Sequence, residues 1–515
     1  MINEVVRAAA ARWGDHPGLI EPDGRKTSVA GLEQFAAHRA AELKHRGIGR
    51  GDVVALCLPS GREYYTSALA LARLGAVVAG INPLLAPAER ASMIDAVGAG
   101  RVLATHDAAE GIPDDVEVHE VVASGGARDG LLGRRPPRAT EIPPPVALAP
   151  DEPCVIVFTS GSTGRPKGAT FTSRQLAAAL EVERADPWSA GNAILSGTQF
   201  PHVGFMLRFP GYLEMATTLV LLGRWSAGDA LDVIGRHRMP AVNGVAAQLA
   251  LMLREPDIGE RDFSHVKRIV TGGGPATPAL IEEVTATFGA PFTSRYSLTE
   301  AGGVGTATAL DGDLEERAYT VGRPRPGVSL RIAGVVGERG EGEVGEIQLR
   351  GPAVMSGYWG SPEASREVLE DGWLSTGDLG CLDDRGLLRL AGRTNEMYVR
   401  GGYNVYPQEV EAVLNAHPGV ASINIVPRPD DVMGQIGVAA VIPRDDRQRP
   451  TLEDLRAHGL GRLARYKLPE AVSYLDEFPV TAMNKTDRRA LTSRIGEPDG
   501  VDEFLHPGPD REVRR

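Results

Sequence analysis

The densest group of chemically useful side chains lies between residues 158 and 168, where the sequence reads FTSGSTGRPKG. The apolar stretch 154–158 predicts a buried strand, and the residues from Thr172 onward have helical periodicity. Glycines, hydroxyls and a lysine between a strand and a helix expose backbone N–H groups and an ammonium together. Because such groups bind a polyphosphate, the run predicts a nucleotide site around Lys167.

This run differs from the common phosphate-binding loop. In that loop Ser or Thr follows the lysine and binds a metal ion, whereas Gly168 follows Lys167 here. Taken alone, a stretch rich in Gly and Ser is more often a surface turn. Arginine, however, supplies 49 of the 55 basic residues, so a lysine inside the run indicates a need for a compact point charge.

Two later patches could surround a nucleotide base. Residues 271–278, TGGGPATP, place a glycine turn after an apolar strand, where a flat ligand can lie against the backbone. Residues 296–300, YSLTE, combine an aromatic face, a hydroxyl and a carboxylate. A core aromatic is the commoner role for Tyr296 when it is considered alone.

Two charged patches follow. Asp378 lies in the turn sequence STGDLG, where it could accept two hydrogen bonds from a ribose diol, and Arg393 supplies a cation farther along the chain. Lys485 stands isolated in PVTAMNKTDRRAL. Considered singly, Asp378 is more often a turn former and Lys485 a solvated charge, so only the combination indicates a site.

Length and composition limit the class of protein. A chain of 515 residues that is 42% hydrophobic can bury large cores and should form at least two domains. The net charge of -12 argues against nucleic acid or an anionic membrane as the main partner. The three cysteines are far apart and form no C-x-x-C pair, so neither a disulfide framework nor a zinc site is expected. Without a membrane span or signal peptide, we expect a cytoplasmic protein.

The order of elements predicts an α/β fold. The first 120 residues alternate helices and strands, which indicates a parallel, helix-covered sheet. Residues 124–150 are rich in Gly, Pro and Arg and read as a linker. Short strands broken by glycine predict a β-rich subdomain over 321–390, and the chain beyond 397 predicts a small α+β domain.

In this order the patches resemble the AMP-forming adenylating enzymes, which include acyl- and aryl-CoA synthetases, peptide-synthetase adenylation domains and beetle luciferase. The resemblance extends from residue 48 to 491. It implies a large N-terminal domain over 1–394 with the ATP and acyl pockets. It also implies a small mobile C-terminal domain over 396–515 that carries the catalytic lysine, with a hinge at Asn395.

The resemblance also implies a role for each motif residue. The phosphate loop comprises Thr159, Ser160, Gly161, Ser162, Thr163, Gly164 and Lys167. The adenine site comprises Gly273, Gly274, Pro275, Tyr296 and Ser297, and the ribose site comprises Asp378 and Arg393. Thr299 contacts the α-phosphate, Glu300 holds Mg2+, and Lys485 bridges the substrate carboxylate and the α-phosphate. Gly401 and Gly402 admit CoA.

The chemistry implied by these roles is the attack of a carboxylate on the α-phosphorus of ATP. Two anions approach each other and charge grows as pyrophosphate leaves, so positive charge must be placed there. Lys485, Mg2+ on Glu300 and the phosphate-loop donors would supply it, and losing one such group typically costs about 10²-fold in rate. No proton has to be abstracted from the substrate.

Transfer of the acyl group to CoA is less strongly indicated. In the family, the small domain rotates about a hinge that is commonly Asp or Lys, whereas this chain has Asn395. Asn484 stands where Gly is frequent, and Ser297 stands where YGxTE usually has Gly. Asparagine tolerates left-handed dihedrals, and Ser297 adds a side chain beside the expected carboxylate. An adenylation-only ligase that passes its product to a carrier protein or a second enzyme therefore stays open.

The stretch TQFPHVGFMLRFPGYL from Thr198 corresponds to the acyl-pocket helix of the family and places His202 near the substrate carboxylate. The aspartate that pairs an amino-acid ammonium in peptide synthetases is not present here. The apolar residues 203–206 instead predict a hydrophobic acid, whether fatty, aryl or polycyclic. For Arg208 a structural ion pair is expected rather than a contact with a second substrate carboxylate.

Two rival functions share the nucleotide motifs. A luciferase-type oxygenase has all of them, and a non-catalytic paralogue could keep the fold, although Glu300, Asp378, Arg393 and both lysines are retained here. The tail after Leu491 has no recognisable carrier-domain attachment serine, which favours a stand-alone ligase. A homodimer is an open alternative to a monomer.

Overall fold

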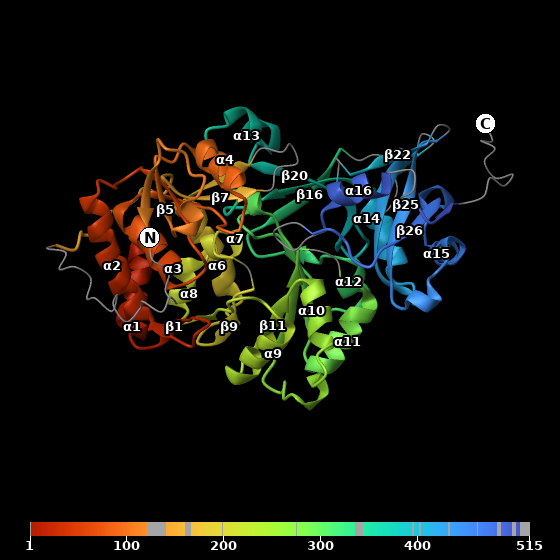
Figure 1. Ribbon diagram of the computed structural model, residues 1–515, viewed down its shortest axis with the longest axis horizontal. Coiled ribbons are helices and arrows are strands. Elements are labelled where there is room, and N and C mark those ends of the chain that lie inside the picture. Colours follow the sequence, from red (N-terminus) through yellow and green to blue (C-terminus); the bar gives the residue numbers. More distant parts are fainter. Residues whose placement is uncertain are drawn as a thin grey trace.

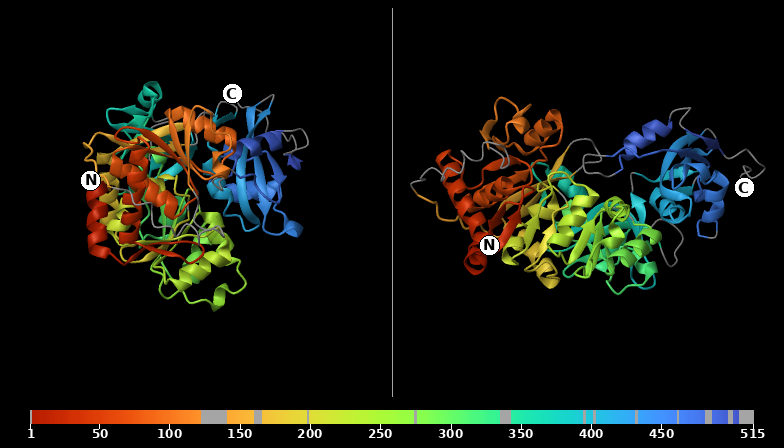
Figure 2. Two further views of the ribbon diagram at one scale, coloured as in Figure 1. Left: turned by 60° about the vertical axis from the view of Figure 1, so that its left-hand side comes forward. Right: turned by 60° about the horizontal axis from the view of Figure 1, so that its bottom comes forward.

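The computed structural model describes most of the chain. The described residues are 2–121, 141–159, 166–197, 199–273, 276–334, 343–393, 396–400, 403–430, 433–460, 462–480, 486–496 and 501–504. The molecule is elongated, with the N-terminal helices at one end and the C-terminal strands at the other (Figure 1). Both views in Figure 2 keep these two ends apart.

The first large sheet has seven strands in the order β18-β8-β7-β4-β3-β5-β6. Its parallel part comprises β3 (Val53–Cys57), β4 (Val77–Gly80), β5 (Arg101–Ala104), β6 (Glu117–Glu120) and β7 (Pro153–Thr159). The helices α2 (Val29–His45), α3 (Arg62–Leu74) and α4 (Pro87–Val97) are interspersed with the first of these strands. The parallel, helix-covered sheet expected from the first part of the chain is thus confirmed.

One strand of this sheet was not expected from the sequence. β8 (Lys167–Thr172) runs antiparallel to β7, and Thr159 is the register partner of Lys167. The helix α6 (Ser173–Ala185) begins only after β8. The residues around Lys167 therefore join two strands rather than a strand and a helix. β8 forms because its apolar and β-branched residues complete a buried ladder with β7.

Two smaller sheets complete the N-terminal part. One comprises β1 (Pro17–Ile20), β2 (Lys26–Ser28), β9 (Ala193–Leu195) and β10 (Thr218–Val220). The other comprises the parallel strands β11 (Ala241–Gly244), β12 (Arg268–Gly272) and β13 (Phe292–Tyr296), followed by β14 (Thr306–Ala307) and β15 (Arg323–Pro324). The helices α9 (Ala227–Arg236), α10 (Ala246–Leu253) and α11 (Pro278–Phe288) lie beside this sheet (Figure 1). The carboxyl ends of parallel strands are the usual ligand edge of such a sheet.

The expected β-rich subdomain is also present. It comprises β16 (Ser329–Ala333), β17 (Gly345–Arg350), β19 (Leu369–Glu370), β20 (Trp373–Leu382) and β21 (Leu388–Arg393), all paired antiparallel. Asp378 on β20 and Arg393 on β21 are register partners. The hairpin register thus brings together two residues that are 15 positions apart.

The C-terminal part has a sheet and a core of its own. The strands are β22 (Tyr398–Arg400), β23 (Tyr403–Val405), β24 (Val420–Asp430), β25 (Gly434–Pro443), β26 (Ala471–Tyr474) and β27 (Glu503–Phe504). The helices are α14 (Pro407–Leu414), α15 (Leu452–Gly459) and α16 (Arg488–Gly496). Tyr398, Val410, Ile425 and Val441 belong to a buried cluster formed within this part. A small α+β unit at this end is confirmed, and the hinge residue Asn395 lies outside the described residues.

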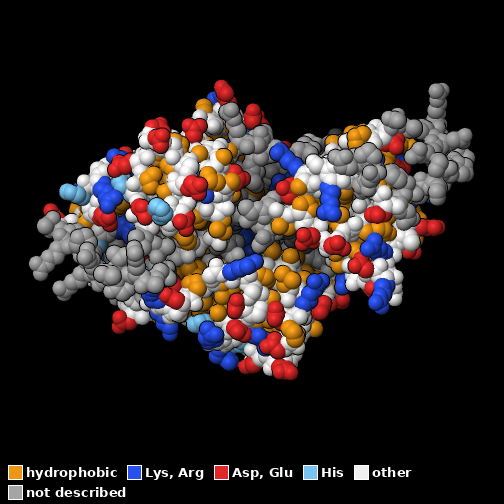
Figure 3. Space-filling model, in the orientation of Figure 1, with side chains coloured by type: hydrophobic (Ala, Val, Ile, Leu, Met, Phe, Trp, Pro, Cys, Tyr) orange, Lys and Arg blue, Asp and Glu red, His pale blue; other side chains and the backbone are white. Residues whose placement is uncertain are grey.

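One face of the molecule carries both acidic and basic side chains (Figure 3), as expected from a sequence with 67 acidic and 55 basic residues. Acidic and basic side chains are interspersed over the face drawn in Figure 3. None of the helices that the structure describes combines the length and the apolarity needed to cross a membrane.

Candidate active site

The carboxylate of Asp378 is held from two sides. Its Oδ2 accepts a hydrogen bond from the hydroxyl of Tyr296 at 2.7 Å, and its Oδ1 lies 2.9 Å from Nε of Arg393. Tyr296 ends β13, so the carboxyl end of the parallel sheet meets the β20–β21 hairpin at this point. Burial and the adjacent Asp378 raise the pKa of Tyr296 well above its ordinary value, so its hydroxyl stays a donor.

Glu300 lies on the 3₁₀ turn η3 (Thr299–Ala301), four residues beyond Tyr296. Its Oε1 accepts a hydrogen bond of 2.9 Å from the hydroxyl of Tyr358 on β18 (Gly357–Tyr358). The ammonium of Lys167 lies over the ring of the same tyrosine, with Nζ 5.2 Å from the ring centroid. The lysine of the phosphate loop and the carboxylate expected to bind Mg2+ are thus joined through Tyr358.

Gly273 follows β12 at the ligand edge of the sheet. Its φ of 79° lies in the left-handed region that favours glycine, so the chain can turn sharply there. On the strand before it, Thr271 donates from Oγ1 to the carbonyl of Gly244 at 2.9 Å, which ties the ends of β11 and β12 together. This is a backbone edge against which a flat base can lie.

His202 caps the short helix α7 (Val203–Met206). Its Nδ1 accepts a hydrogen bond from the backbone N–H of Gly204 at 3.2 Å. In a neutral imidazole this acceptor role places the ring proton on Nε2. This bond fixes the orientation of the His202 ring at the start of α7.

Arg208 forms the structural ion pair expected from the sequence. Its Nε lies 3.1 Å from Oε1 of Glu183, and its Nη2 donates to the carbonyl of Gly303 at 3.0 Å. Arg325 approaches the same Glu183 oxygen to 3.4 Å. Burial acts to raise the pKa of Glu183, but the charges of Arg208, Arg325 and Arg295 outweigh it and lower the pKa to about 2. Arg208 is therefore already paired within the protein, with Glu183 and the carbonyl of Gly303.

A cluster of aromatic side chains packs α7 against α3. Phe200 and Phe205 stack with ring centroids 3.7 Å apart, and Tyr64 and Tyr65 of α3 meet them edge-on. The hydroxyl of Tyr65 donates to the carbonyl of Phe209 at 2.6 Å. The segment that carries His202 is thus anchored to the core of the first sheet.

The donor set fits Mg2+ bound together with a nucleotide. Among the described residues, the structure has no cluster of three or more His, Cys, Asp or Glu side chains that could hold a metal ion alone. Mg2+ is usually bound by one or two carboxylates together with substrate phosphates. Glu300 has a second carboxylate oxygen beyond the one that Tyr358 contacts, and it can serve this purpose.

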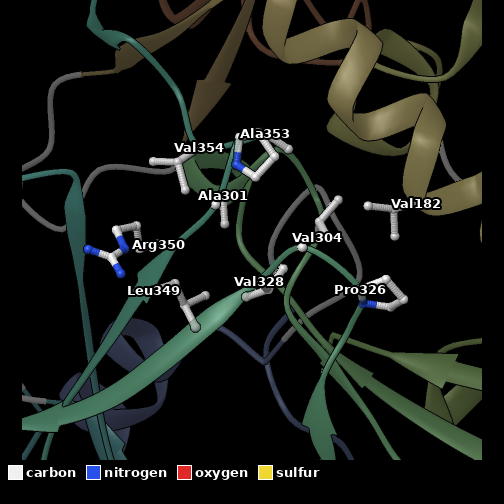
Figure 4. Close-up of a pocket in the computed structure, with 12 residues that line it drawn as sticks. Val182, Ala301, Val304, Pro326, Val328, Leu349, Arg350, Ala353 and Val354 are labelled. Atoms are coloured by element: carbon white, nitrogen blue, oxygen red, sulfur yellow. The ribbon is translucent and has the colours of Figure 1, made fainter.

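A small, mostly apolar pocket lies beside η3, which contributes Ala301 to its lining (Figure 4). It is lined by Ala301, Val304, Val328 and Leu349, with Val182 of α6 on one side. It lies where the turn packs against β16 and β17. This lining offers packing rather than ligand recognition.

Several expected site residues lie outside the described part of the chain. They are Ser160, Gly161, Ser162, Thr163, Gly164, Gly274, Pro275, Gly401, Gly402 and Lys485. Among the described ones, Tyr296, Asp378 and Arg393 come together directly, and Lys167 meets Glu300 through Tyr358. Thr159 ends β7 beside Lys167, and Ser297 and Thr299 lie between Tyr296 and Glu300. Tyr358 was not expected, because nothing in its sequence setting links it to either charge.

Comparison with known proteins gives this arrangement a family. The profile described as AMP-binding enzyme matches residues 6–359, and the one described as AMP-binding enzyme C-terminal domain matches residues 409–485. The chain belongs to the AMP-binding enzyme family. It is an AMP-forming acid–thiol ligase, a class that uses ATP, Mg2+ and CoA.

Relatives within the AMP-binding enzyme family are similar over almost the whole chain. The indoleacetate–CoA ligase of Aromatoleum aromaticum is 34% identical over 508 residues, which cover 94% of this chain and 98% of that ligase. The fatty acid–[acyl-carrier-protein] ligase ScoC of Streptomyces coeruleorubidus is 32% identical over 489 residues, 92% of each chain. The o-succinylbenzoate CoA synthetase of Bacillus subtilis, solved with its acyl-adenylate intermediate, superposes with a TM-score of 0.82 at 26% identity, covering 97% of this chain and 99% of that one.

Proposed function

We propose that this AMP-binding enzyme activates a hydrophobic carboxylic acid as its acyl adenylate and transfers the acyl group to CoA. The observation that carries the proposal is the five-residue segment from Tyr296 to Glu300. Tyr296 holds the carboxylate of Asp378 at one end, and Tyr358 holds the carboxylate of Glu300 at the other. One rigid segment therefore sets the distance between the group for the ribose and the group for the metal.

The roles of the individual residues follow from this arrangement. Asp378 has lone pairs beyond those used by Tyr296 and Arg393, and these can accept the ribose hydroxyls. Gly273 and the ring of Tyr296 would flank the adenine, and Thr299 would meet the α-phosphate. The bound Mg2+ supplies positive charge at the phosphates. Lys167 neutralises the leaving pyrophosphate, and Lys485 aligns the two reacting anions.

The C-terminal unit completes this site in the proposal. We assign the N-terminal domain to 1–394, the C-terminal domain to 396–515 and the hinge to Asn395. Rotation about this hinge would withdraw Lys485 after adenylation and bring the turn at Gly401 and Gly402 to the acyl adenylate, where CoA attacks.

The acid is proposed to have an uncharged, hydrophobic tail. Residues 203–206 comprise one glycine and three apolar residues, Val203, Phe205 and Met206, which are all buried. Arg208, the nearest arginine in the sequence, is already paired with Glu183 and would have to break that pair to bind a second substrate carboxylate. The related indoleacetate and fatty-acid ligases take acids of this kind.

The acceptor is the main alternative within the proposal. One relative transfers to CoA and another to an acyl carrier protein. The glycine pair at 401–402 suits the thin thiol arm of either acceptor, and we favour CoA because it is the acceptor named for the relative that is 34% identical.

The test is ATP–pyrophosphate exchange across a panel of carboxylic acids, followed by thioester formation with either CoA or an acyl carrier protein. Exchange with fatty, aryl or polycyclic monoacids and thioester with CoA are expected. Exchange with dicarboxylates or amino acids alone would contradict the proposed substrate. Brisk exchange without CoA thioester would identify an adenylation-only ligase.

A further inference from the structure

Tyr358 occupies the position between two opposite charges of the proposed nucleotide site. Its hydroxyl donates to Oε1 of Glu300 at 2.9 Å, and its ring face lies under the ammonium of Lys167 at 5.2 Å. The two charged residues come from different elements, η3 and β8. Tyr358 is thus the contact that the two elements share.

The backbone fixes Tyr358 to both elements. The N–H of Met355 donates to the carbonyl of Glu300 at 2.8 Å, and the N–H of Trp359 donates to the carbonyl of Gly168 at 2.8 Å. Between these bonds, β18 pairs with β8, with Tyr358 opposite Ala169. The segment from Met355 to Trp359 therefore joins the turn that carries Glu300 to the strand that carries Lys167.

Two further contacts set the direction of the tyrosine. Its own N–H donates to Oγ of Ser365 at 2.8 Å. Gly357 before it has a φ of 144°, and a Cβ there would approach the same Oγ to 2.9 Å. A glycine is required for this path of the chain.

The charges need such a separator before nucleotide binds. A carboxylate and an ammonium that meet directly attract each other strongly at a partly buried position. Such a pair would occupy the oxygen intended for the metal and the cation intended for the phosphates. A phenol instead offers the ammonium a weak cation–π partner that the phosphates can displace, and its single hydrogen bond holds one oxygen of Glu300 while the other oxygen stays available to the metal.

We propose that Tyr358 is a positioning residue that keeps Glu300 and Lys167 apart and ready for the metal–nucleotide complex. This inference rests on the proposed function, in which Glu300 binds Mg2+ and Lys167 binds the phosphates. Tyr358 itself contacts neither the acid nor the reacting phosphorus in this scheme. Its effect is on the binding of metal and nucleotide.

Two variants separate the hydroxyl from the ring. Tyr358→Phe removes the bond to Glu300 but keeps the ring between the charges. We expect the metal-free affinity for nucleotide to stay unchanged and the gain from Mg2+ to fall about 10-fold, as for one lost hydrogen bond to a carboxylate. Tyr358→Leu removes the ring as well, so Lys167 can pair with Glu300 and the metal-free affinity should also fall.

A third variant tests the separation directly. Adding Glu300→Gln to Tyr358→Leu removes the negative charge that would capture Lys167. If separation is the role of Tyr358, the double variant regains the metal-free affinity for nucleotide. A general structural defect would not be repaired by this second substitution.

The measurement is calorimetric binding of α,β-methylene ATP to the full chain, in EDTA and in saturating Mg2+. The matched control is Tyr474→Phe, because the Tyr474 hydroxyl also makes a short bond, 2.7 Å to the carbonyl of Pro450, but on the C-terminal sheet. It should leave both constants unchanged. Circular dichroism checks the fold of each variant, and Tyr358→Phe carries the test alone if the leucine variants do not fold.

The outcomes distinguish this inference from the proposed function. If Mg2+ improves binding in the wild-type protein but equally in Tyr358→Phe, the role of Tyr358 is refuted while the assignment of Glu300 stands. The same holds if Glu300→Gln fails to restore the folded leucine variant. If Mg2+ does not affect wild-type binding at all, the metal role of Glu300 is refuted, and this inference fails with it.

Discussion

The carboxylate of Asp378 is oriented without help from a ligand. It is 8% exposed, and each of its oxygens already has a protein partner. A carboxylate fixed in this way loses little conformational freedom when a ribose binds.

Replacing Asp378 should therefore weaken ATP binding rather than the chemical step. In Asp378→Ala we expect the KM for ATP to rise at least ~10-fold, because hydrogen bonds to a charged group are each worth ~1.5–3 kcal/mol. Tyr296→Phe, which keeps the ring, should raise it less. Steady-state exchange kinetics at varied ATP measure both, with the exposed turn variant Asp384→Ala as the control. An unchanged KM in Asp378→Ala would show that Asp378 only supports the β20–β21 hairpin.

In the proposed mechanism Lys485, unlike Asp378, acts in the chemical step rather than in ATP binding. Lys485→Ala should lower acyl-adenylate formation by ~10²-fold or more while ATP still binds, because most nucleotide contacts come from the N-terminal domain. Pyrophosphate exchange and equilibrium ATP binding measure the two effects separately. The matched control is Lys267→Ala, because Lys267 is exposed and is distant from Lys485 in the sequence. Near wild-type exchange in Lys485→Ala would remove it from the mechanism.

The sequence was enough to predict which types of side chain form the site. It was only partly enough to predict which of these side chains contact one another. The hairpin that pairs Asp378 with Arg393 could be anticipated because both lie in short strands near each other in sequence. Tyr358 could not, because its contact with Glu300 joins residues 58 positions apart through strand pairing that the local sequence does not encode.

At the scale of elements, a buried charge cluster holds in place the segment that carries His202 and Arg208. Glu183 of α6 receives Arg208, which precedes α8 (Phe209–Glu214), and Arg325, which follows β15. Arg208 also binds the carbonyl of Gly303, just beyond η3. Three separate parts of the chain therefore meet around the Glu183 carboxylate, and Arg208 links a fourth part to them at Gly303.

This cluster should give the protein a defined sensitivity to acid. The pKa of Glu183 is about 2 in the folded protein, below the value of ~4.3 of an unfolded glutamate. A lowered folded pKa contributes stability above the unfolded value, and that contribution is lost as the pH falls from ~4.3 towards 2.

Glu183→Gln should cost ~3–5 kcal/mol near neutral pH, because it leaves buried arginines without their partner. The difference from wild type should shrink as the pH falls below ~4.3. Urea unfolding followed by tryptophan fluorescence at several pH values measures it. A constant difference across this range would show that the charge of Glu183 is not the cause. Glu181→Gln, on the exposed side of the same helix, is the control.

The strand β8 shows where reasoning from local sequence fails at this scale. The residues 167–172 are too few to display a clear period, and glycine and serine before them indicate only a break. Their strand state depends on the partner β7 on one side and β18 on the other, and β18 comes from almost 190 positions later. In contrast, the long alternation of helices and strands in the first part of the chain was sufficient to predict a parallel sheet.

At the scale of the whole molecule, ion pairs stabilise the C-terminal unit at the point where the chain enters it. Glu396, the first described residue after the proposed hinge, lies 3.5 Å from Arg488 of α16, and Arg488 also binds Glu411 of α14 at 2.6 Å. Arg488 follows Lys485 by three residues. These pairs tie the start of the C-terminal unit to α14 and α16, as the proposed movement of the unit as one body requires.

The proposed rotation can be tested at the glycine pair. Gly402→Leu should leave pyrophosphate exchange intact but stop CoA ester formation, because a side chain would block a thin thiol. Asn395→Pro, which fixes φ near -65°, should lock one state and separate the two half-reactions. Purified acyl adenylate with CoA measures the second step alone. Gly259→Leu, at an exposed glycine with open space around its Cα, is the control. Normal thioester formation in Gly402→Leu would place the CoA channel elsewhere.

The cluster around Glu183 also determines how this enzyme could be redesigned. The segment with His202 and the apolar residues proposed to contact the acid is the natural piece to exchange when a different acid is wanted. Arg208 would leave with that piece, while Glu183 stays behind on α6 and Arg325 on the far side. An exchange that cuts between α6 and α7 and omits the arginine would leave the buried charge of Glu183 without its shorter ion pair, with Arg325 at 3.4 Å as the remaining one. Successful hybrids should therefore transplant residues 173–215 as one block, or retain an arginine at position 208.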